Sequence, residues 1–154
     1  MIDDLDKRLI AELARDARQT SSKLSQKLGV SDTTVRHRIN RLQKQQIISN
    51  STIVPNAAKL GYSVIVLIAL QVALGSLDTA AQELSNHPNV HYVAECTGVH
   101  DIFIGVWLES TQQLTQFVKE FIAKLPGIKS SETFMILNVT KNDVGWLQSL
   151  GAEE

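Results

Sequence analysis

Features of an exported, disulfide-bonded or membrane-spanning protein are scarce in this sequence. Its 154 residues include one cysteine, Cys96, so no internal disulfide can form, and a reducing cytoplasm suits such a chain. The longest apolar run, Val64–Leu74, falls well short of the roughly 20 residues that span a bilayer, so we interpret it as a buried strand. The N-terminus, Met1–Lys7, is acidic, whereas a signal peptide begins basic and continues apolar. We therefore expect a cytoplasmic protein without a membrane anchor.

Motifs of common catalytic and metal sites are also missing. The sequence has no Gly-rich phosphate loop, serine nucleophile elbow or zinc-hydrolase helix. The best cluster of reactive side chains surrounds one predicted hairpin and consists of His91, Glu95, Cys96, His100 and Asp101. Its spacing does not match tetrahedral metal sites, and strand alternation places Cys96 on the core face, where a free thiol is usually inert packing. We therefore expect no enzymatic activity, no metal and no cofactor.

The overall charge of −1 hides an asymmetry between the two parts of the chain. Residues 1–50 contain ten Lys and Arg against six Asp and Glu, a net charge of +4, so the remaining 104 residues carry −5. A concentration of positive charge is typical of a DNA-binding module, whereas phosphates would repel the acidic part. The charge pattern predicts two domains with different roles.

Ser31–Gln46 is predicted to be a helix with two unlike faces. Ser31 suits the N-cap, and Asp32 supports the cap and the helix dipole. One face is an apolar stripe of Val35, Ile39 and Leu42. The other face carries hydroxyl, amide and cationic side chains: Thr33, Thr34, Arg36, His37, Asn40, Arg41 and Lys44. This pattern alone would also fit a solvated surface helix.

The preceding residues favour a helix-turn-helix motif over that simpler interpretation. Thr20–Leu28 is a short helical segment, Gly29–Val30 supplies a tight turn, and Asp4–Ala14 forms a first helix behind the other two. In such a motif the second helix enters the major groove of DNA. We expect Thr33, Thr34, His37 and Arg38 nearest the base edges, and Arg36, Arg41 and Lys44 chiefly on phosphates.

Beyond this helix the apolar pattern loses its helical period. Ile47–Pro55 is predicted to be a short β-hairpin or extended segment, which would form a small wing before a linker. We therefore divide the chain into a helix-turn-helix domain at residues 1–50, a wing and linker at 51–62, and a second domain at 63–154.

The second domain has the element order strand, helix, strand, strand, helix, strand. The predicted segments are Val64–Leu74, Leu77–Leu84, Val90–Thr97, Ile102–Glu109, Leu114–Leu125 and Lys129–Thr140. This is the order of the ferredoxin-like βαββαβ fold, an antiparallel sheet with both helices on one face. The whole chain is thus predicted to be α+β, with a winged helix-turn-helix domain before a ferredoxin-like domain.

Both faces of this predicted sheet are apolar. In the strand Ile102–Glu109, Phe103 and Trp107 alternate with apolar residues of the opposite face. Because two helices cover only one face, we expect a second subunit to cover the other, with Phe103 and Trp107 in a homodimer interface. The alternative is that the wing, the linker or the C-terminal tail with Trp146 covers it.

Several of these segments are similar to one known family. Leu5–Leu13, Asp16–Arg18, Leu28–Ser31 and Val35–Leu42 resemble the helix-turn-helix domain of the Lrp/AsnC, or feast/famine, transcription regulators. Thr97–Asp101 resembles the family's Gly-x-x-Asp turn. One departure lies in the first domain, where Gln46 stands just after the predicted recognition helix and the family usually has glycine. The resemblance implies a second domain that dimerises, often assembles into tetramers or octamers, and commonly binds amino acids between subunits.

A small-molecule site is predicted at the turn of Thr97, Gly98, Val99, His100 and Asp101. Glycine lets backbone N–H groups approach a ligand carboxylate, and Asp101 offers a counter-charge to an ammonium group. The resemblance implies effector contacts at the same positions, with Ser131 and Thr133 as hydroxyl candidates. The alternative is that turn geometry alone selects glycine and aspartate here.

These observations together predict a sequence-specific DNA-binding transcriptional regulator. Its partners would be double-stranded DNA, at least one further copy of itself, and an amino acid or related effector bound between C-terminal domains. The alternative is a small-molecule-binding βαββαβ module without DNA-binding function.

Overall fold

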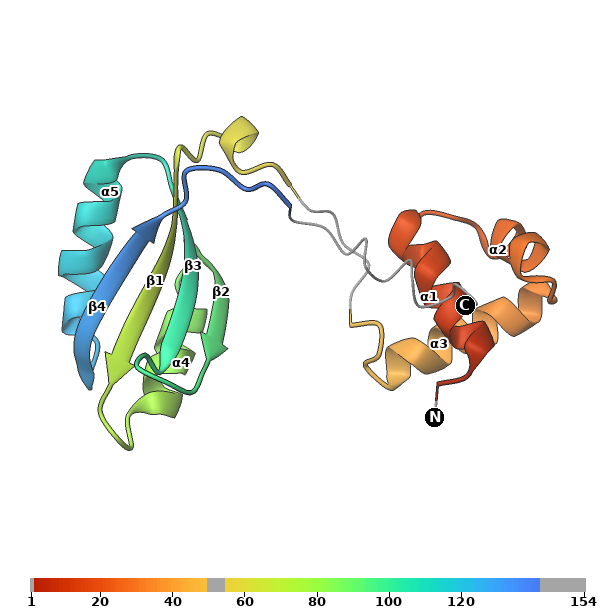
Figure 1. Ribbon diagram of the computed structural model, residues 1–154, viewed down its shortest axis with the longest axis horizontal. Helices are drawn as coiled ribbons and strands as arrows, with labels where there is room; N and C mark the ends of the chain where they lie inside the picture. The colour runs from red at the N-terminus through yellow and green to blue at the C-terminus, as the bar shows by residue number, and fades with distance from the viewer. Residues whose placement is uncertain (1, 50–54, 142–154) are drawn as a thin grey trace. The chain divides into compact units, whose positions relative to one another are not determined.

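The computed structural model describes residues 2–49 and 55–141, drawn in colour in Figure 1. The chain divides into two compact units, of which the first includes residues 2–49 and the second includes residues 55–139. No helix in the described part of the chain is long and apolar enough to cross a membrane.

The first unit is the predicted bundle of three helices: α1 (Asp4–Arg15), α2 (Ser21–Leu28) and α3 (Asp32–Lys44). Each helix begins with a side-chain cap, in which Asp3, Thr20 and Ser31 each accept the backbone N–H of the third residue of the helix. Helix α2 ends at Gly29, whose φ of 70° favours glycine. The buried core consists of Leu9, Leu24, Leu28, Val35 and Leu42.

Helix α3 stops without the glycine that is usual in the family. Gln46 adopts the left-handed conformation at φ 55°, and the N–H groups of Ile47 and Ile48 both donate to the carbonyl oxygen of Leu42. These bonds cap the last turn of the helix, so the exit is tight. Residues 45–48 form turns and bends rather than a strand. Most of the remaining predicted wing, residues 50–54, lies outside the described residues.

The second unit confirms the ferredoxin-like prediction. Its elements are η1 (Ala58–Leu60), β1 (Val64–Val72), α4 (Leu77–Ser85), β2 (Val90–Glu95), β3 (Ile102–Leu108), α5 (Thr111–Gln116), η2 (Phe117–Phe121), η3 (Ile122–Lys124) and β4 (Ile128–Met135). The strands form one antiparallel sheet in the order β2-β3-β1-β4. Alternate residues of β1 and β3 share a buried core with α4 and the helix after β3. Both helices therefore cover the same face.

Two boundaries differ from the sequence prediction. The second helix changes at Phe117 from α-helix to the π-helical turn η2, which brings residues five apart, such as Phe117 and Ile122, onto the core side. The last strand ends at Met135, which pairs with Val66, instead of at Thr140, and one further backbone hydrogen bond joins Ile136 N–H to the carbonyl of Ile65 at 2.9 Å.

Candidate nucleic-acid interface and effector turn

The exposed face of α3 is a narrower set of residues than the sequence predicted. Helix α3 has six exposed side chains, of which Gln43 is one. The other five follow one another at helical spacing: Thr33, Arg36, His37, Asn40 and Lys44. Their spacing of three or four residues places them in one stripe along the helix. Asn40 belongs to this stripe, although the sequence pattern placed it only on the polar face and it was not predicted to contact DNA. We call these five residues the α3 stripe.

Arg38 and Arg41 belong to a different environment, in which both guanidinium groups turn toward α1. Arg38 Nη1 lies 2.8 Å from Asp6 Oδ1 and 2.6 Å from both carboxylate oxygens of Asp3. Arg41 Nη2 pairs with the other oxygen of Asp6. Asp6 is completely buried, whereas the arginine side chains are 22% and 34% exposed. The structure thus gives both arginines the role of joining α3 to α1.

Helix phase explains the position of Arg38. The residue follows Val35 by three positions and precedes Leu42 by four, so its side chain leaves from the edge of the buried stripe. Its hydrogen bonds to Asp3 and then Asp6 raise the arginine pKa. The hydrogen bond from Arg38 lowers the pKa of Asp3 to about 2. This pairing is possible because Asp3 and Asp6 also form the capping box of α1.

Thr34 and Arg36 are also tied to the start of α3. Thr34 donates its backbone N–H to Ser31 Oγ at 3.1 Å, and the two hydroxyl groups lie 2.7 Å apart. Through these contacts Thr34 forms part of the N-cap, and its side chain is half-buried. Arg36 Nη2 lies 2.9 Å from Asp32 Oδ2, but its side chain is 69% exposed and remains accessible. Such surface pairs contribute little to stability and are easily exchanged.

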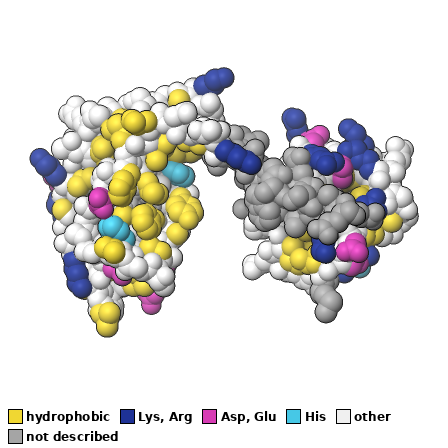
Figure 2. All heavy atoms as spheres, viewed as in Figure 1, with side chains coloured by type: hydrophobic (Ala, Val, Ile, Leu, Met, Phe, Trp, Pro, Cys, Tyr) yellow, Lys and Arg dark blue, Asp and Glu magenta, His cyan; other side chains and the backbone are white. Residues whose placement is uncertain are grey.

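Every acid within residues 2–49 forms an ion pair with a cation of the same segment. These acids are Asp3, Asp4, Asp6, Glu12, Asp16 and Asp32. Within residues 2–49, three cations have no carboxylate partner, namely Arg8, Lys23 and Lys44. Figure 2 shows Lys and Arg side chains on the surface of this unit. The excess positive charge is therefore available to a polyanion at the surface.

One face of the sheet in the second unit is apolar and open. Hydrophobic side chains gather over it in Figure 2. Phe103 and Trp107 of β3 are half-buried on this face, and Tyr92 and Phe134 of the two edge strands are 53% and 42% exposed. Trp107 also contacts Tyr62 and His91, with ring centroids 5.9 and 4.6 Å apart. Burial of His91 lowers the pKa of its imidazole.

The turn Thr97–Asp101 is anchored to the neighbouring strand by Asp101. Its Oδ2 accepts the N–H of Val72 at 2.7 Å, and its own N–H donates to Leu70 at 2.8 Å. Gly98 has a φ of 127°, which favours glycine. One carboxylate oxygen of Asp101 thus closes the turn, so its role is structural at least in part.

Cys96 is half-buried in the same turn, and its thiol donates to the carbonyl of His100 at 3.0 Å. The residues with which it alternates, Tyr92 and Ala94, pair with Gly105 and Phe103 of the open face. The prediction that Cys96 shares the core face was therefore wrong, because the register of β2 shifts between Val90 and Tyr92 and reverses the alternation after that point.

Strand register separates the predicted hydroxyl candidates from the turn. Ser131 and Thr133 pair with Leu70 and Ile68, so they share the helix-covered face of the sheet. The turn instead contacts open-face residues: Gln71 Nε2 donates to Val99 at 2.8 Å, and His100 Nε2 lies 3.3 Å from Glu132 Oε2. Ser130 Oγ donates to Gln71 Oε1 at 2.8 Å. Three residues thus adjoin the turn, namely Gln71, Ser130 and Glu132. The sequence alone could not identify them, because their position depends on the register between β4 and β1.

Family comparisons match both units. Residues 2–43 match the family model of the AsnC-type helix-turn-helix domain, and residues 65–148 match the model described as the PF0864 C-terminal dimeric alpha+beta barrel domain. The chain is 34% identical over 140 residues to the uncharacterized HTH-type transcriptional regulator PH0140 of Pyrococcus horikoshii, which covers 91% of this chain and 89% of that protein.

Solved structures share the whole fold. Escherichia coli AsnC superimposes with a TM-score of 0.84 at 26% identity, covering 92% of this chain and 96% of that one. The regulator NMB0573 of Neisseria meningitidis, solved in complex with L-Met, gives a TM-score of 0.85 over 94% and 96% of the two chains, and its 16% identity shows the fold alone. Three observations lead to one conclusion: both family models match, PH0140 is 34% identical over most of its length, and the first unit has three helices. The chain belongs to the Lrp/AsnC family of helix-turn-helix transcriptional regulators and is a DNA-binding regulator.

Proposed function

We propose that the α3 stripe is the surface that contacts DNA. Thr33, His37 and Asn40 would face base edges, and Arg36 and Lys44 would lie along the phosphates. The observation that carries this proposal is the division of α3 into an exposed polar stripe and an opposite side held by the core and by Asp6. Side chains near the start of a recognition helix reach bases, and cations toward its end meet the backbone.

Binding of variants to two duplexes tests this assignment. One duplex is selected by the wild-type protein from a random library, and the other is an unselected sequence. His37→Ala should lower affinity mainly for the selected duplex, whereas Lys44→Ala should weaken both equally, because phosphate contacts carry no sequence information. Lys7→Ala, on the exposed side of α1, is the control. Equal losses for His37→Ala on both duplexes would contradict the proposed base contact.

The open sheet face would be the homodimer interface, with Phe103 and Trp107 in its centre. Its apolar surface and the matched family's dimeric barrel support this proposal. Phe134→Glu, which places a charge on the open face, should convert the dimer to a monomer in light scattering at micromolar concentration. Leu74→Glu is the control, since Leu74 is fully exposed in the loop after β1. A wild-type monomer would contradict the interface. Whether dimers assemble into tetramers or octamers is read from the same experiment.

The turn Thr97–Asp101 would hold an amino-acid effector near the subunit interface. Gly98 gives a ligand carboxylate access to backbone N–H groups, and Glu132, which adjoins the turn, would receive the ammonium group. In this proposal Ser130 and Glu132 replace Ser131 and Thr133, because they share the face of the turn. A structural relative bound to L-Met supports an amino acid as the ligand class.

A thermal-shift screen of the twenty amino acids tests the effector site. One or a few should raise the melting temperature of the wild type, since a ligand that binds only the folded state stabilises it. Glu132→Gln should weaken this response, whereas Glu83→Gln on α4 should not. We avoid Asp101→Ala as the main variant, because Asp101 also holds the turn to β1. A response that Glu132→Gln leaves unchanged would exclude this arrangement.

Because DNA is the ligand of the first unit, we place the protein in the cytoplasm.

A further inference from the structure

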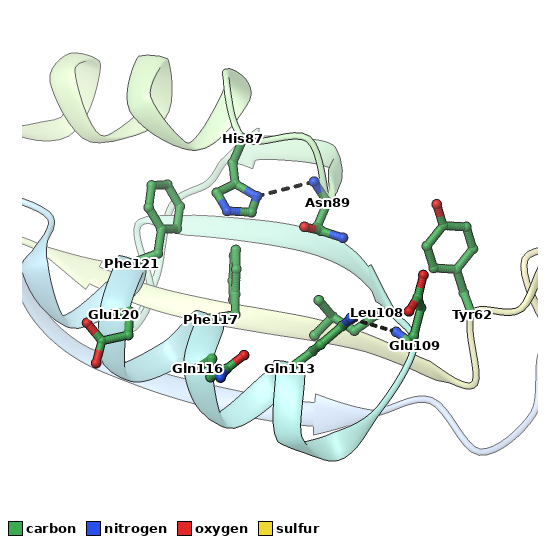
Figure 3. A pocket seen from close by; sticks show the side chains of 10 residues that line it. All are labelled: Tyr62, His87, Asn89, Leu108, Glu109, Gln113, Gln116, Phe117, Glu120 and Phe121. Carbon is green, nitrogen blue, oxygen red and sulfur yellow. Dashed lines mark hydrogen bonds between the residues drawn. The ribbon is translucent and has the colours of Figure 1, made fainter.

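The second unit contains a pocket of about 360 Å³ that the proposed effector and dimer sites do not use. It lies between the loop that joins α4 to β2 and the helical segment after β3 (Figure 3). Leu108 and Glu109, at the C-terminal end of β3, belong to its lining, whereas the turn Thr97–Asp101 precedes the other end of that strand. The pocket is therefore distant from the turn along β3.

Aromatic rings form one wall of this pocket. The imidazole of His87 packs against Phe117 and Phe121, with centroid distances of 4.8 and 4.4 Å, and the two phenyl rings are 5.3 Å apart. His87 Nδ1 accepts the N–H of Asn89 at 3.2 Å, so its remaining proton sits on Nε2. Burial lowers the pKa of His87. The imidazole is consequently neutral at pH 7 and adds no positive charge to the wall.

The charged groups that line the pocket are carboxylates. Glu109 lies beside Tyr62 and is hydrogen-bonded to Gln113, and Glu120 lies at the opposite end next to Phe121 (Figure 3). The lining contains no lysine or arginine. Glu120 pairs with Lys124 in an exposed contact, which a competing cation can exchange at little cost. Residues 55–139 contain four lysines against seven acids, so the surrounding surface also favours positive ligands.

A π-helical turn shapes the same wall. Phe117, Glu120 and Phe121 all belong to η2, and all three line the pocket. Such turns are rare and occur frequently at functional sites, because the extra residue in the turn redirects side chains. Here the turn places two aromatic rings and a carboxylate around one cavity.

We propose that this pocket binds a small organic cation, an aliphatic ammonium or guanidinium compound. One charged group of the ligand would lie near Glu109 and a second near Glu120 at the opposite end, and the alkyl chain between them would lie over Phe117 and Phe121. Aromatic faces attract cations, and neighbouring carboxylates complete the charge compensation. The pocket would give the regulator a second ligand site, independent of the turn.

Calorimetric titration of the full chain tests the proposal with putrescine and agmatine as ammonium and guanidinium probes. Butanol, which has the four-carbon chain of putrescine but no charge, is the ligand control. At least one cationic probe should bind saturably at one site per chain, and butanol should not. Glu109→Gln and Phe121→Leu should each weaken binding at least tenfold. Glu83→Gln changes the same net charge on α4, outside the pocket, and should leave binding unchanged.

Absence of saturable binding by both probes would overturn the proposal. Binding that Glu109→Gln leaves intact would do so as well, and this variant should fold normally because Glu109 is exposed. Equal weakening by Glu83→Gln would show a general response to charge. Weakening by Glu132→Gln would place the ligand at the turn. Either of the last two results would also refute a separate cation site.

Discussion

Replacing Asp6 by asparagine removes the charge that joins α1 to α3 while nearly preserving the shape of the side chain. Asp6 is fully buried and faces Arg38 on one oxygen and Arg41 on the other. The asparagine amide presents N–H groups to one of these guanidinium donors, so that arginine loses its acceptor. The backbone N–H of Asp3, which donates to Asp6 Oδ2 at 3.1 Å, also depends on the orientation of the amide.

The expected loss of unfolding free energy depends on how deeply Asp6 and its two arginine partners are buried. Removing one member of a fully buried ion pair costs about 3 to 5 kcal/mol. Arg38 and Arg41 are 22% and 34% exposed, so water can partly solvate them, and Arg38 also keeps its contact with Asp3. We therefore expect the free energy of unfolding of the first unit to fall by about 2 to 3 kcal/mol. For a small domain this lowers the melting temperature by roughly 10 to 20 °C.

Urea unfolding followed by the helical circular dichroism signal measures this loss in the full chain. Asp4→Asn is the matched control, because Asp4 is on the same helix and pairs with Lys7 at the surface. That variant should change stability by less than about 0.5 kcal/mol. Arg38→Ala should resemble Asp6→Asn in stability. If Asp6→Asn and Asp4→Asn unfold at the same urea concentration, the cluster does not hold the unit together and our role for Arg38 fails.

Three further predictions concern turns and titration. Gly127→Ala should destabilise the second unit by roughly 3 kcal/mol in thermal unfolding, and Gly75→Ala by only about 1 kcal/mol. Both glycines have positive φ, but only a Cβ at Gly127 would collide with the side chain of Ser76, so equal effects would contradict the steric argument. The stability that Asp3 contributes should be present above pH 3.8 and lost as pH falls toward about 2, and Asp3→Asn should remove this part of the acid profile. Because burial lowers the pKa of His91 below its ordinary 6.5, its neutral form is favoured on folding, so stability should decrease as pH falls below 6.5; His91→Gln should reduce that slope, measured by tryptophan fluorescence.

Most helices and strands could be predicted because their evidence is local. Ser31 caps α3 at the predicted position, and Gly29 ends α2 as expected. The apolar spacing within Ile102–Leu108 identified a strand with two apolar faces, and hence the open sheet face. Periodicity also located the helix after β3, but a 3.6-residue pattern cannot reveal the change to a π turn at Phe117.

The contacts of the candidate sites depend on partners that are remote in sequence. Arg38 looked like a DNA-contacting residue because it lies on a basic helix, and only the position of α1 shows that Asp3 and Asp6 reach it. Likewise, Glu132 adjoins the turn because of the register between β4 and β1. A shift of one residue would have brought Thr133 there instead. Sequence reasoning thus found the elements of both sites, and tertiary pairing decided which side chains they present.

Salt-dependent binding of duplex DNA tests the central claim most directly. The full chain is titrated into a labelled duplex selected by the wild-type protein, at several salt concentrations between about 50 and 200 mM. We expect the logarithm of the binding constant to fall linearly with the logarithm of salt concentration, and the slope to decrease by about 1 in Lys44→Ala. The fold of that variant should be unchanged, since Lys44 is exposed at the end of α3. Binding that does not respond to salt, or a slope that Lys44→Ala leaves unaltered, would contradict the assignment of the α3 stripe to DNA.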